Sequence, residues 1–289
     1  MKRTLSCLFI IFLFLLTCCS KHSDEKVIKV MTLNLRYDNP RDSINAWPIR
    51  ASIVCNFLKN ENPDLLGMQE VLFHQYEILD SVLTDYSSVG VGRNDGAKSG
   101  EMNPIFFKKE RFDMVRTITF WLSETPGVPG SMAWGASLPR IVTWMELVNK
   151  KTHEHIFYFN THFAHDSDSA RIRSSKLLLS KVDSIASGFP FIITGDFNML
   201  PDSKGYAILT GPAESVPLLK DSYAISEKKP EGPRYTFNGF SDKYGSGRID
   251  YIFVKEGLGV LEHRTIIKKD HGIYISDHWP VEAMVSLNK

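Results

Sequence analysis

Apolar and polar positions alternate at the start of the main body of the chain and predict a strand there. Residues 26–38, KVIKVMTLNLRYD, place aliphatic or β-branched side chains at nearly every second position. In residues 47–60 the spacing changes, because apolar side chains recur every four positions from Ile49 to Phe57. Pro48 suits the first turn of a helix, where its missing N–H costs nothing. A strand followed by an amphipathic helix is therefore predicted.

Strand-like runs dominate the middle and the last third of the chain. Four β-branched and aromatic runs before Ser169 follow one another without a long helix, which indicates antiparallel pairing. A helix is predicted from Ser169, and strands with short connections follow it. Two such sets of strands in a mixed α/β chain predict two packed sheets with helices outside. The further strands are predicted at 63–70, 103–109, 112–123, 140–149, 153–163, 189–198, 248–254, 263–269 and 279–287, and a second helix at 73–83.

A basic and then strongly apolar segment precedes this body. Lys2 and Arg3 lead into LFIIFLFLL at residues 8–16. This run is shorter than the roughly 20 apolar residues that a helix needs to cross a bilayer. We interpret residues 1–18 as a signal peptide of the lipoprotein type, with an uncleaved anchor helix as the alternative. The protein is thus expected to be exported to a bacterial cell envelope, on the periplasmic face or at the cell surface.

The cysteines fit the same interpretation. The ending LTCCS resembles a bacterial lipobox, which would place a lipid on Cys18 or Cys19 as the only contact with the membrane. Residues 19–26 would then be a polar tether, and residues 27–289 one folded domain. Cys55 is left without a disulfide partner in that domain, and we expect it to be a buried residue on a helix, not a nucleophile.

The composition narrows the class of partner. The chain has 289 residues, 43% hydrophobic and 23% charged, which is ordinary for a globular protein of one large domain. Its formal net charge is +1. Proteins that grip long nucleic acids through many phosphates usually carry a basic stripe, so avid binding to a duplex is disfavoured. We expect a monomer.

Polar side chains stand at the ends of several predicted strands. Taken alone, each has an ordinary explanation: Glu70 as a solvated residue, Asn34 as an amide between strands, and His162 as a packed histidine. The segment GDFN at 195–198 offers two oxygen-bearing side chains after a strand, although its residues are also turn formers. Because α/β sheets collect their active sites at strand ends, the full set predicts one site. The set is Asn34, Glu70, His162, Asp196, Asn198, Asp250, Asp277 and His278.

These residue types suit the metal-assisted hydrolysis of a phosphate ester. The reaction needs charge neutralisation, an oriented nucleophile and help for the leaving oxygen. Mg²⁺ prefers oxygen ligands, and Glu70 and Asn34 would supply them, with Asp277 as a further candidate. Asp196 would take a proton from the attacking water or orient it, and Asn198 would hold the water or a phosphate oxygen.

Histidines would supply the donors that this reaction needs. An imidazolium stabilises charge that develops on the phosphoryl group, and a carboxylate keeps it charged and correctly rotated. Asp250 with His278 offers that pair, and His162 could be a second donor. The sequence has no Cys/His spacing of a zinc site, no Gly-rich phosphate loop and no G-x-S-x-G nucleophile.

The ordered motifs resemble the endonuclease/exonuclease/phosphatase superfamily. LNLR, MQE, NTHF, GDFN, RIDYIF and SDHWPV occur in the order of the family and span nearly the whole body. Members include DNase I-like nucleases, abasic-site endonucleases, sphingomyelinases, inositol polyphosphate 5-phosphatases and carbon-catabolite-repressor-type deadenylases. The resemblance implies a DNase I-like, four-layer α/β sandwich, with two mixed β-sheets packed face to face and flanked by helices.

The same resemblance implies roles for single residues. By similarity, Asn34 and Glu70 form the metal-site pair, and Asp277 is linked to the metal or to phosphate. Asp196 activates water, and Asn198 binds the phosphate or orients the nucleophile. By the same similarity, Asp250 would orient His278.

Other positions carry information about the branch of the family. His162 lies where abasic endonucleases use tyrosine, which argues against an abasic-site specialist. The segments FWLSETP and SLPRIVTW resemble bacterial, deadenylase-like members, which makes Arg140 a candidate phosphate contact, with a structural salt bridge as the alternative. Arg248 is expected to position a strand rather than touch substrate.

We therefore expect a phosphoesterase that depends on Mg²⁺ or Mn²⁺. A nuclease or nucleotide phosphodiesterase is the first choice of substrate class. A phosphatase or phospholipase C-like enzyme for inositol, sugar or sphingolipid phosphates is the alternative, and a non-catalytic binding lipoprotein is the alternative of another class. Loops around 92–102, 122–139 and 225–246 are expected to shape specificity. Three tryptophans could stack on bases or sugars, or belong to the core: Trp121, Trp134 and Trp144.

Overall fold

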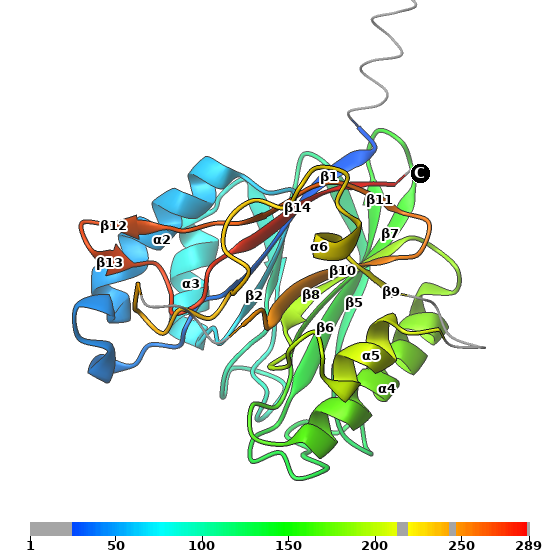
Figure 1. The fold of residues 1–289 in the computed structure, drawn as a ribbon, viewed down its shortest axis with the longest axis horizontal. Helices are drawn as coiled ribbons and strands as arrows, with labels where there is room; N and C mark the ends of the chain where they lie inside the picture. Colours follow the sequence, from blue (N-terminus) through cyan, green and yellow to red (C-terminus); the bar gives the residue numbers. More distant parts are fainter. Residues whose placement is uncertain (1–24, 213–218, 243–246, 288–289) are drawn as a thin grey trace, which may run out of the picture.

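Two six-stranded sheets lie face to face between two layers of helices (Figure 1). The computed structural model describes residues 25–212, 219–242 and 247–287. The signal peptide, Cys18 and Cys19, and most of the tether at 19–26 lie outside these residues, so those interpretations stay predictions. None of the helices in the described ranges combines the length and the apolar character needed to span a bilayer.

The first sheet has the strand order β11-β14-β1-β2-β4-β3. β1 runs parallel to β2 and antiparallel to β14, so the sheet is mixed. Helices α2 and α3 cover its outer face (Figure 1). The elements are β1 (Val27–Asn34), β2 (Leu65–Gln69), β3 (Tyr86–Val89), β4 (Ile105–Lys108), β11 (Gly259–Thr265), β14 (Val281–Ser286), α2 (Trp47–Glu61) and α3 (Phe73–Val82).

The second sheet has the strand order β5-β6-β7-β8-β10-β9, and α4 and α5 cover its outer face (Figure 1). Its first three strands pair antiparallel, as the strand-rich middle of the sequence predicted. The elements are β5 (Phe112–Trp121), β6 (Ile141–Asn149), β7 (His155–His162), β8 (Phe191–Asp196), β9 (Leu219–Asp221), β10 (Asp250–Lys255), α4 (Asp168–Ala186) and α5 (Lys204–Thr210). Short elements complete the fold: η1 (Pro40–Asn45), α6 (Ser222–Ile225), β12 (Lys269–Asp270) and β13 (Ile273–Tyr274). The predicted four-layer fold class is confirmed.

Two local predictions were wrong. The strand expected at 263–269 is β11 at Gly259–Thr265, because its pairing with β14 ends where Pro280 interrupts the ladder. In α2 the predicted apolar face holds at Phe57 and Ile53, which pack on the core, but is wrong at Ile49, which is 47% exposed. The helix also buries Arg50, Val54 and Leu58.

Arg50, a residue of α2, is fully buried and forms hydrogen bonds to several other segments of the chain. Its guanidinium donates to the backbone carbonyls of Leu35 (2.7 Å) and Ile275 (2.9 Å). Two further bonds reach the carbonyls of Asn45 (2.8 Å) and Arg36 (2.6 Å). Burial lowers the pKa of Arg50 to about 10, which still leaves the group charged at neutral pH. One side chain thus donates to four backbone carbonyls, one at the end of η1 and three just beyond β1 and β13.

A cluster of buried polar side chains joins the two sheets. Gln69 of the first sheet donates to the Oδ1 of Asn160 in the second (2.6 Å), and Asn160 donates back to the carbonyl of Met68 (2.7 Å). Gly67 lies at the same crossing, where a Cβ atom would stand 2.3 Å from the Oγ1 of Thr194. We call Gln69, Asn160 and Thr194 the intersheet cluster. Because its hydrogen bonds are directional, it fixes how the sheets align.

Three core predictions can be compared with the structure. Cys55 is buried on α2, and burial raises the pKa of its thiol, as expected for a structural cysteine. Trp121 and Trp144 are also buried, which confirms the core interpretation for both. Trp134 is half-buried and does not line the cavity described below.

Candidate active site

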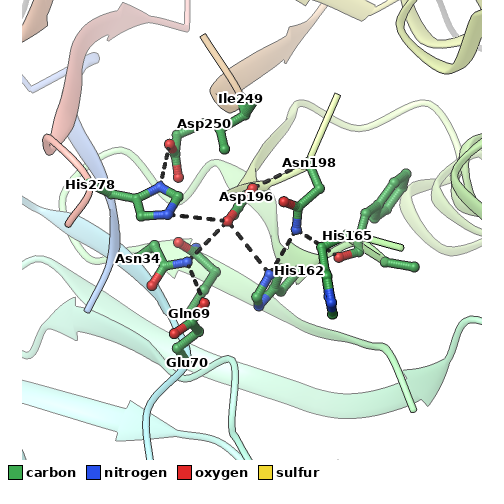
Figure 2. Close-up of polar contacts among 12 residues, drawn as sticks. Asn34, Gln69, Glu70, His162, His165, Asp196, Asn198, Ile249, Asp250 and His278 are labelled. Carbon is green, nitrogen blue, oxygen red and sulfur yellow. Dashed lines mark hydrogen bonds and ion pairs between the residues drawn. The ribbon is translucent and has the colours of Figure 1, made fainter. Parts of the chain in front are cut away.

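Segments far apart in the sequence meet at one edge of the paired sheets (Figure 2). β7 runs parallel to β8 and places His162 beside Asp196, and β10 runs antiparallel to β8 and places Asp250 opposite Asp196. β1 and β2 end together at the same edge of the first sheet. The structure thereby brings together all eight predicted strand-end residues, namely Asn34, Glu70, His162, Asp196, Asn198, Asp250, Asp277 and His278.

Asp196 lies at the centre of this group (Figure 2). Its Oδ1 accepts the backbone N–H of Asn198 (2.9 Å), and its Oδ2 accepts the side-chain amide of Asn34 (3.0 Å). Burial, followed by the nearby negative charge of Asp250, raises the pKa of Asp196 to about 7. A carboxylate that titrates near neutral pH is matched to the work of a general base.

His278 and Asp250 form the expected pair. The Nδ1 of His278 lies 2.8 Å from Oδ2 of Asp250, and its Nε2 lies 3.8 Å from Oδ2 of Asp196. Burial disfavours the charged imidazole, but the carboxylate of Asp250 and then that of Asp196 outweigh burial and raise the pKa of His278 well above its ordinary value. The ring of Phe237 packs edge-on against it at 5.1 Å. His278 is therefore a charged donor held at a fixed rotation.

His162 and Asn198 form a second pair, in which the histidine is neutral and accepts a hydrogen bond. The Nδ2 of Asn198 donates to the carbonyl of Phe163 (3.0 Å), which fixes the orientation of this amide. The same Nδ2 lies 3.0 Å from Nε2 of His162, so this ring nitrogen accepts. Burial, followed by the charges of Arg140 and Arg93, lowers the pKa of His162 well below its ordinary value. His162 is thus a neutral ring that accepts from Asn198 at Nε2 and carries its remaining N–H on Nδ1, which has no hydrogen-bond partner among the described residues, so its role as a second donor stays a prediction.

Asn34 holds two carboxylates with its amide N–H groups. Its Nδ2 donates to Glu70 (3.1 Å) as well as to Asp196, and its Oδ1 accepts the backbone N–H of Arg36 (2.9 Å). Glu70 adopts a left-handed backbone, with φ of 58°, a strained conformation that often marks functional sites. The N–H side of the Asn34 amide therefore faces the carboxylates, and placing its oxygen beside a cation held by them would require the amide to turn over.

Two sets of residues offer ligand atoms for a cation. Asp196, Asp250 and His278 place one atom each within 4.8 Å of one another, but a charged His278 that is bonded to Asp250 is a poor ligand. Glu70 and Asp277 also line the cavity and offer carboxylate oxygen atoms. Burial, with the charge of Glu70 adding to it, raises the pKa of Asp277, so a cation between these carboxylates would relieve a real charge conflict. The second set fits Mg²⁺ or Mn²⁺.

A cavity of about 870 Å³ opens beside these residues. Each of the three loops that were expected to shape specificity contributes a side chain to its wall: Glu101, Leu138 and Phe237. None of these residues was singled out from the sequence, because loop positions carry no periodic signal. Further lining residues that the sequence did not indicate are Tyr37, His165, Asp168, Arg171, Leu200 and Asp202.

Arg140 lines the same cavity and is buried, being 5% exposed. Its Nη2 lies 2.9 Å from Nδ1 of His165, while its Nε and Nη1 have no hydrogen-bond partner among the described residues. Burial, followed by the charge of Arg93, lowers the pKa of Arg140. The predicted alternative, a structural salt bridge, is not found among the ion pairs of the described residues.

Arg248 lies away from the cavity wall and packs as a structural residue. Its guanidinium pairs with Asp221 and lies between the rings of Tyr223 and Tyr251, at 4.6 Å from each centroid. Tyr251 in turn donates to the carbonyl of Met199 (2.8 Å), just beyond Asn198. This arrangement agrees with the expectation that Arg248 positions β10.

The whole domain is similar to proteins of known structure. An endonuclease/exonuclease/phosphatase from Bacteroides vulgatus is 36% identical, with a TM-score of 0.86 over 91% of this chain and 99% of the other. A mannosyl-6-phosphatase from Bacteroides thetaiotaomicron is 32% identical, with a TM-score of 0.83 over 90% of this chain and 100% of the other. An uncharacterized protein of Acanthamoeba polyphaga mimivirus is 29% identical over 280 residues, 88% of this chain and 98% of that relative.

The sequence itself carries the family pattern across its length. Residues 31–278 match the family described as the Endonuclease/Exonuclease/phosphatase family. The match begins within β1 and ends at the histidine of the His278–Asp250 pair. The chain therefore belongs to the endonuclease/exonuclease/phosphatase family, and it is a phosphoesterase.

Proposed function

We propose that this protein hydrolyses the phosphate ester of a small molecule with the help of Mg²⁺ or Mn²⁺. The observation that carries the proposal is Asp196, a buried carboxylate with a pKa of about 7 that faces the cavity between Asn198 and the charged His278. A cation bound by Glu70 and Asp277 would neutralise phosphate charge and help the leaving oxygen.

The residues of this chain account for the steps at phosphorus. Asp196 accepts a proton from water, while Asn198 and Asn34 hold the Asp196 carboxylate in position through its two oxygens. The water oxygen bonds to phosphorus as the bond to the leaving oxygen breaks, and the leaving oxygen takes a proton from solvent. His278, kept charged by Asp250, donates a hydrogen bond to the charge that develops on the phosphoryl oxygens.

Sugar phosphates are the favoured substrates. One related structure, at 32% identity over 90% of this chain, is a mannosyl-6-phosphatase. The wall of the cavity carries the carboxylates of Asp168 and Asp202, which can accept hydrogen bonds from sugar hydroxyls. Asp168 is paired with Arg171, and Asp202 would repel a polyanionic chain. The apolar side chains of Leu200 and Phe237 line the cavity as well, and sugar rings have an apolar face.

Nucleotides or single-stranded nucleic acid are the second candidate, because two aromatic side chains, Tyr37 and Phe237, line the cavity and could stack on a base. A direct comparison separates the classes. Purified protein with Mg²⁺ is incubated with mannose 6-phosphate, a single-stranded RNA oligonucleotide, a phosphoinositide and sphingomyelin. We expect the fastest hydrolysis for the sugar ester and no turnover in EDTA. The product of each substrate is measured, because cleavage of a diester such as RNA or sphingomyelin frees no inorganic phosphate. Turnover that persists in EDTA would contradict the metal, and hydrolysis of RNA alone would contradict the substrate class.

A further inference from the structure

Four guanidinium groups lie in or next to the cavity, and three of them are neutralised by a carboxylate. Arg36 pairs with Asp42 through two bonds of 2.9 Å, and Arg171 pairs with Asp168. A third pair joins Arg93 to Glu101, a residue of the cavity wall, through two bonds of 2.6 and 2.9 Å.

Arg140 is the exception among these four. Within the described ranges the only hydrogen bond of its guanidinium joins Nη2 to the imidazole of His165. Its Nε and Nη1 are buried and have no partner there. The charges of Glu101, Asp196 and Glu70 act on it from nearby, but none of these carboxylates forms an ion pair with it. A buried cation without a direct ion pair is costly, and buried N–H groups without partners are rare in folded proteins. The free energy of this arrangement improves when an anion enters the cavity.

The position of Arg140 identifies that anion. Arg140 directly precedes β6, and because β6 runs antiparallel to β7, it lies next to the end of β7 that carries His162. Both residues line the cavity, together with Asp196. The guanidinium therefore faces the region where the reacting phosphoryl group must lie, and its planar fork of donors matches the geometry of phosphate oxygens.

We propose that Arg140 is a specificity-determining residue that selects phosphate monoesters over diesters. This inference rests on the proposed phosphoesterase function. A terminal phosphoryl group has three non-bridging oxygens and carries close to two negative charges at neutral pH, whereas a diester has two such oxygens and one charge. Asp196 and Glu70 repel the extra charge of a monoester, and the unpaired Arg140 compensates for it.

Two chromogenic substrates test this selection, namely p-nitrophenyl phosphate and bis-p-nitrophenyl phosphate with Mg²⁺. The variant Arg140→Gln is expected to lose about 100-fold in kcat/KM for the monoester and less than about threefold for the diester. Inorganic phosphate should also inhibit the variant at least about tenfold more weakly, since it presents the same oxygens. The matched control is Arg173→Gln, which removes an exposed guanidinium from α4 and should leave both rates unchanged.

Each outcome bears on either the inference or the proposed function. Equal loss on both substrates, or no loss on either, would overturn the selective role while the phosphoesterase function stands. A wild-type enzyme that prefers the diester would overturn it too. If the wild type hydrolyses neither ester with Mg²⁺, the proposed function itself fails. Should Arg140→Gln not fold, Arg140→Lys keeps the charge without the planar fork and is expected to lose about tenfold on the monoester alone.

Discussion

At the residue scale, Asp196 is the side chain whose negative charge is most disfavoured by its surroundings, because it is buried and lies beside a second carboxylate. It is buried next to Asp250, its register partner across β8 and β10, and both carboxylates depend on His278 for positive charge. A carboxylate placed in this way is destabilising in the free protein and useful in the reaction. Active sites commonly hold groups whose pKa is shifted for their task at such a cost.

The first prediction concerns catalysis by this residue. Asp196→Asn keeps the shape but cannot take a proton from water. It also keeps only one of the two bonds that Asp196 accepts from Asn34 and Asn198, because an amide NH2 group donates and does not accept. We expect kcat to fall by about 10³-fold with little change in KM, measured by phosphate release with saturating Mg²⁺. Asp183→Asn on the exposed side of α4 is the matched control and should be fully active. A variant of Asp196 with wild-type kcat would remove this residue from the reaction.

The second prediction concerns stability and pH. The folded pKa of Asp196, about 7, is raised from the ordinary value of 3.8, so the folded state binds this proton more tightly than the unfolded state. Its contribution to stability is complete below pH 3.8 and is lost as pH rises through about 7. In EDTA, the free energy of unfolding of the wild type should fall relative to Asp196→Asn over this range, by up to about 4 kcal/mol. Urea titrations at several pH values measure the difference, and parallel curves would contradict it.

The sequence predicted the charged residues of the site better than their neighbours. Glu70, Asp196 and His278 follow strands and belong to recognisable motifs, so their meeting at one sheet edge could be expected. Glu101 and Phe237 lie in irregular loops, and only the fold brings them to the cavity. The direction of each hydrogen bond could not be predicted from the sequence either, because it depends on which neighbouring groups fix the orientation of an amide or an imidazole side chain.

At the scale of elements, α2 illustrates how a helix is held by a polar residue. A third prediction follows from its buried Arg50. Replacing Arg50 with Met removes a donor from four backbone carbonyls, of which only that of Arg36 keeps another among the described residues, the side-chain amide of Gln75 (3.2 Å). The change should cost at least about 3 kcal/mol of unfolding free energy, measured by urea denaturation. On the same helix, Ile49→Ala removes an exposed side chain and should change stability by less than about 0.5 kcal/mol. Equal effects of the two variants would contradict the structural role of Arg50.

Long, patterned elements were predictable and short ones were not. The strands of the two sheet centres have β-branched or alternating sequences that survive in the fold as β1, β6, β7, β8 and β10. β3, with the sequence YSSV, and β9, with LKD, are too short and too polar to carry a period. In β11 the apolar run extends past Thr265, and the pairing ends at Pro280, directly before the partner strand β14, because proline has no N–H to return the bond that Ile266 donates to it. The ends of such strands are set by contacts with other segments and cannot be predicted from the sequence of one segment.

At the scale of the whole molecule, the family fold explains how a near-neutral protein can be a phosphoesterase. The net charge is +1, and the cavity wall itself mixes carboxylates with guanidinium groups, so the positive charge required at phosphorus comes from single groups such as Arg140 and His278 and not from a basic surface. This distribution favours small substrates over long nucleic acids, whose binding depends on many phosphate contacts.

The fourth prediction concerns the N-terminus, where we propose a lipid anchor. In a bacterial host that processes lipoproteins, the full-length protein should incorporate labelled palmitate and enter the detergent phase of a Triton X-114 extraction. Either Cys18→Ser or Cys19→Ser should abolish both signals, and Cys55→Ser should abolish neither. Labelling that survives in both N-terminal variants would contradict the lipobox interpretation.

The intersheet cluster has a consequence for how activity can be lost. The first sheet supplies Glu70 and the loop with His278, and the second supplies Asp196 and Asp250. Neither sheet contains all the reacting groups, so hydrolysis requires the two sheets to be packed against each other. During denaturation, phosphoesterase activity should be lost in the same transition in which the fluorescence of the buried Trp144 changes. A fragment that contains only one of the two sheets should hydrolyse no phosphate ester.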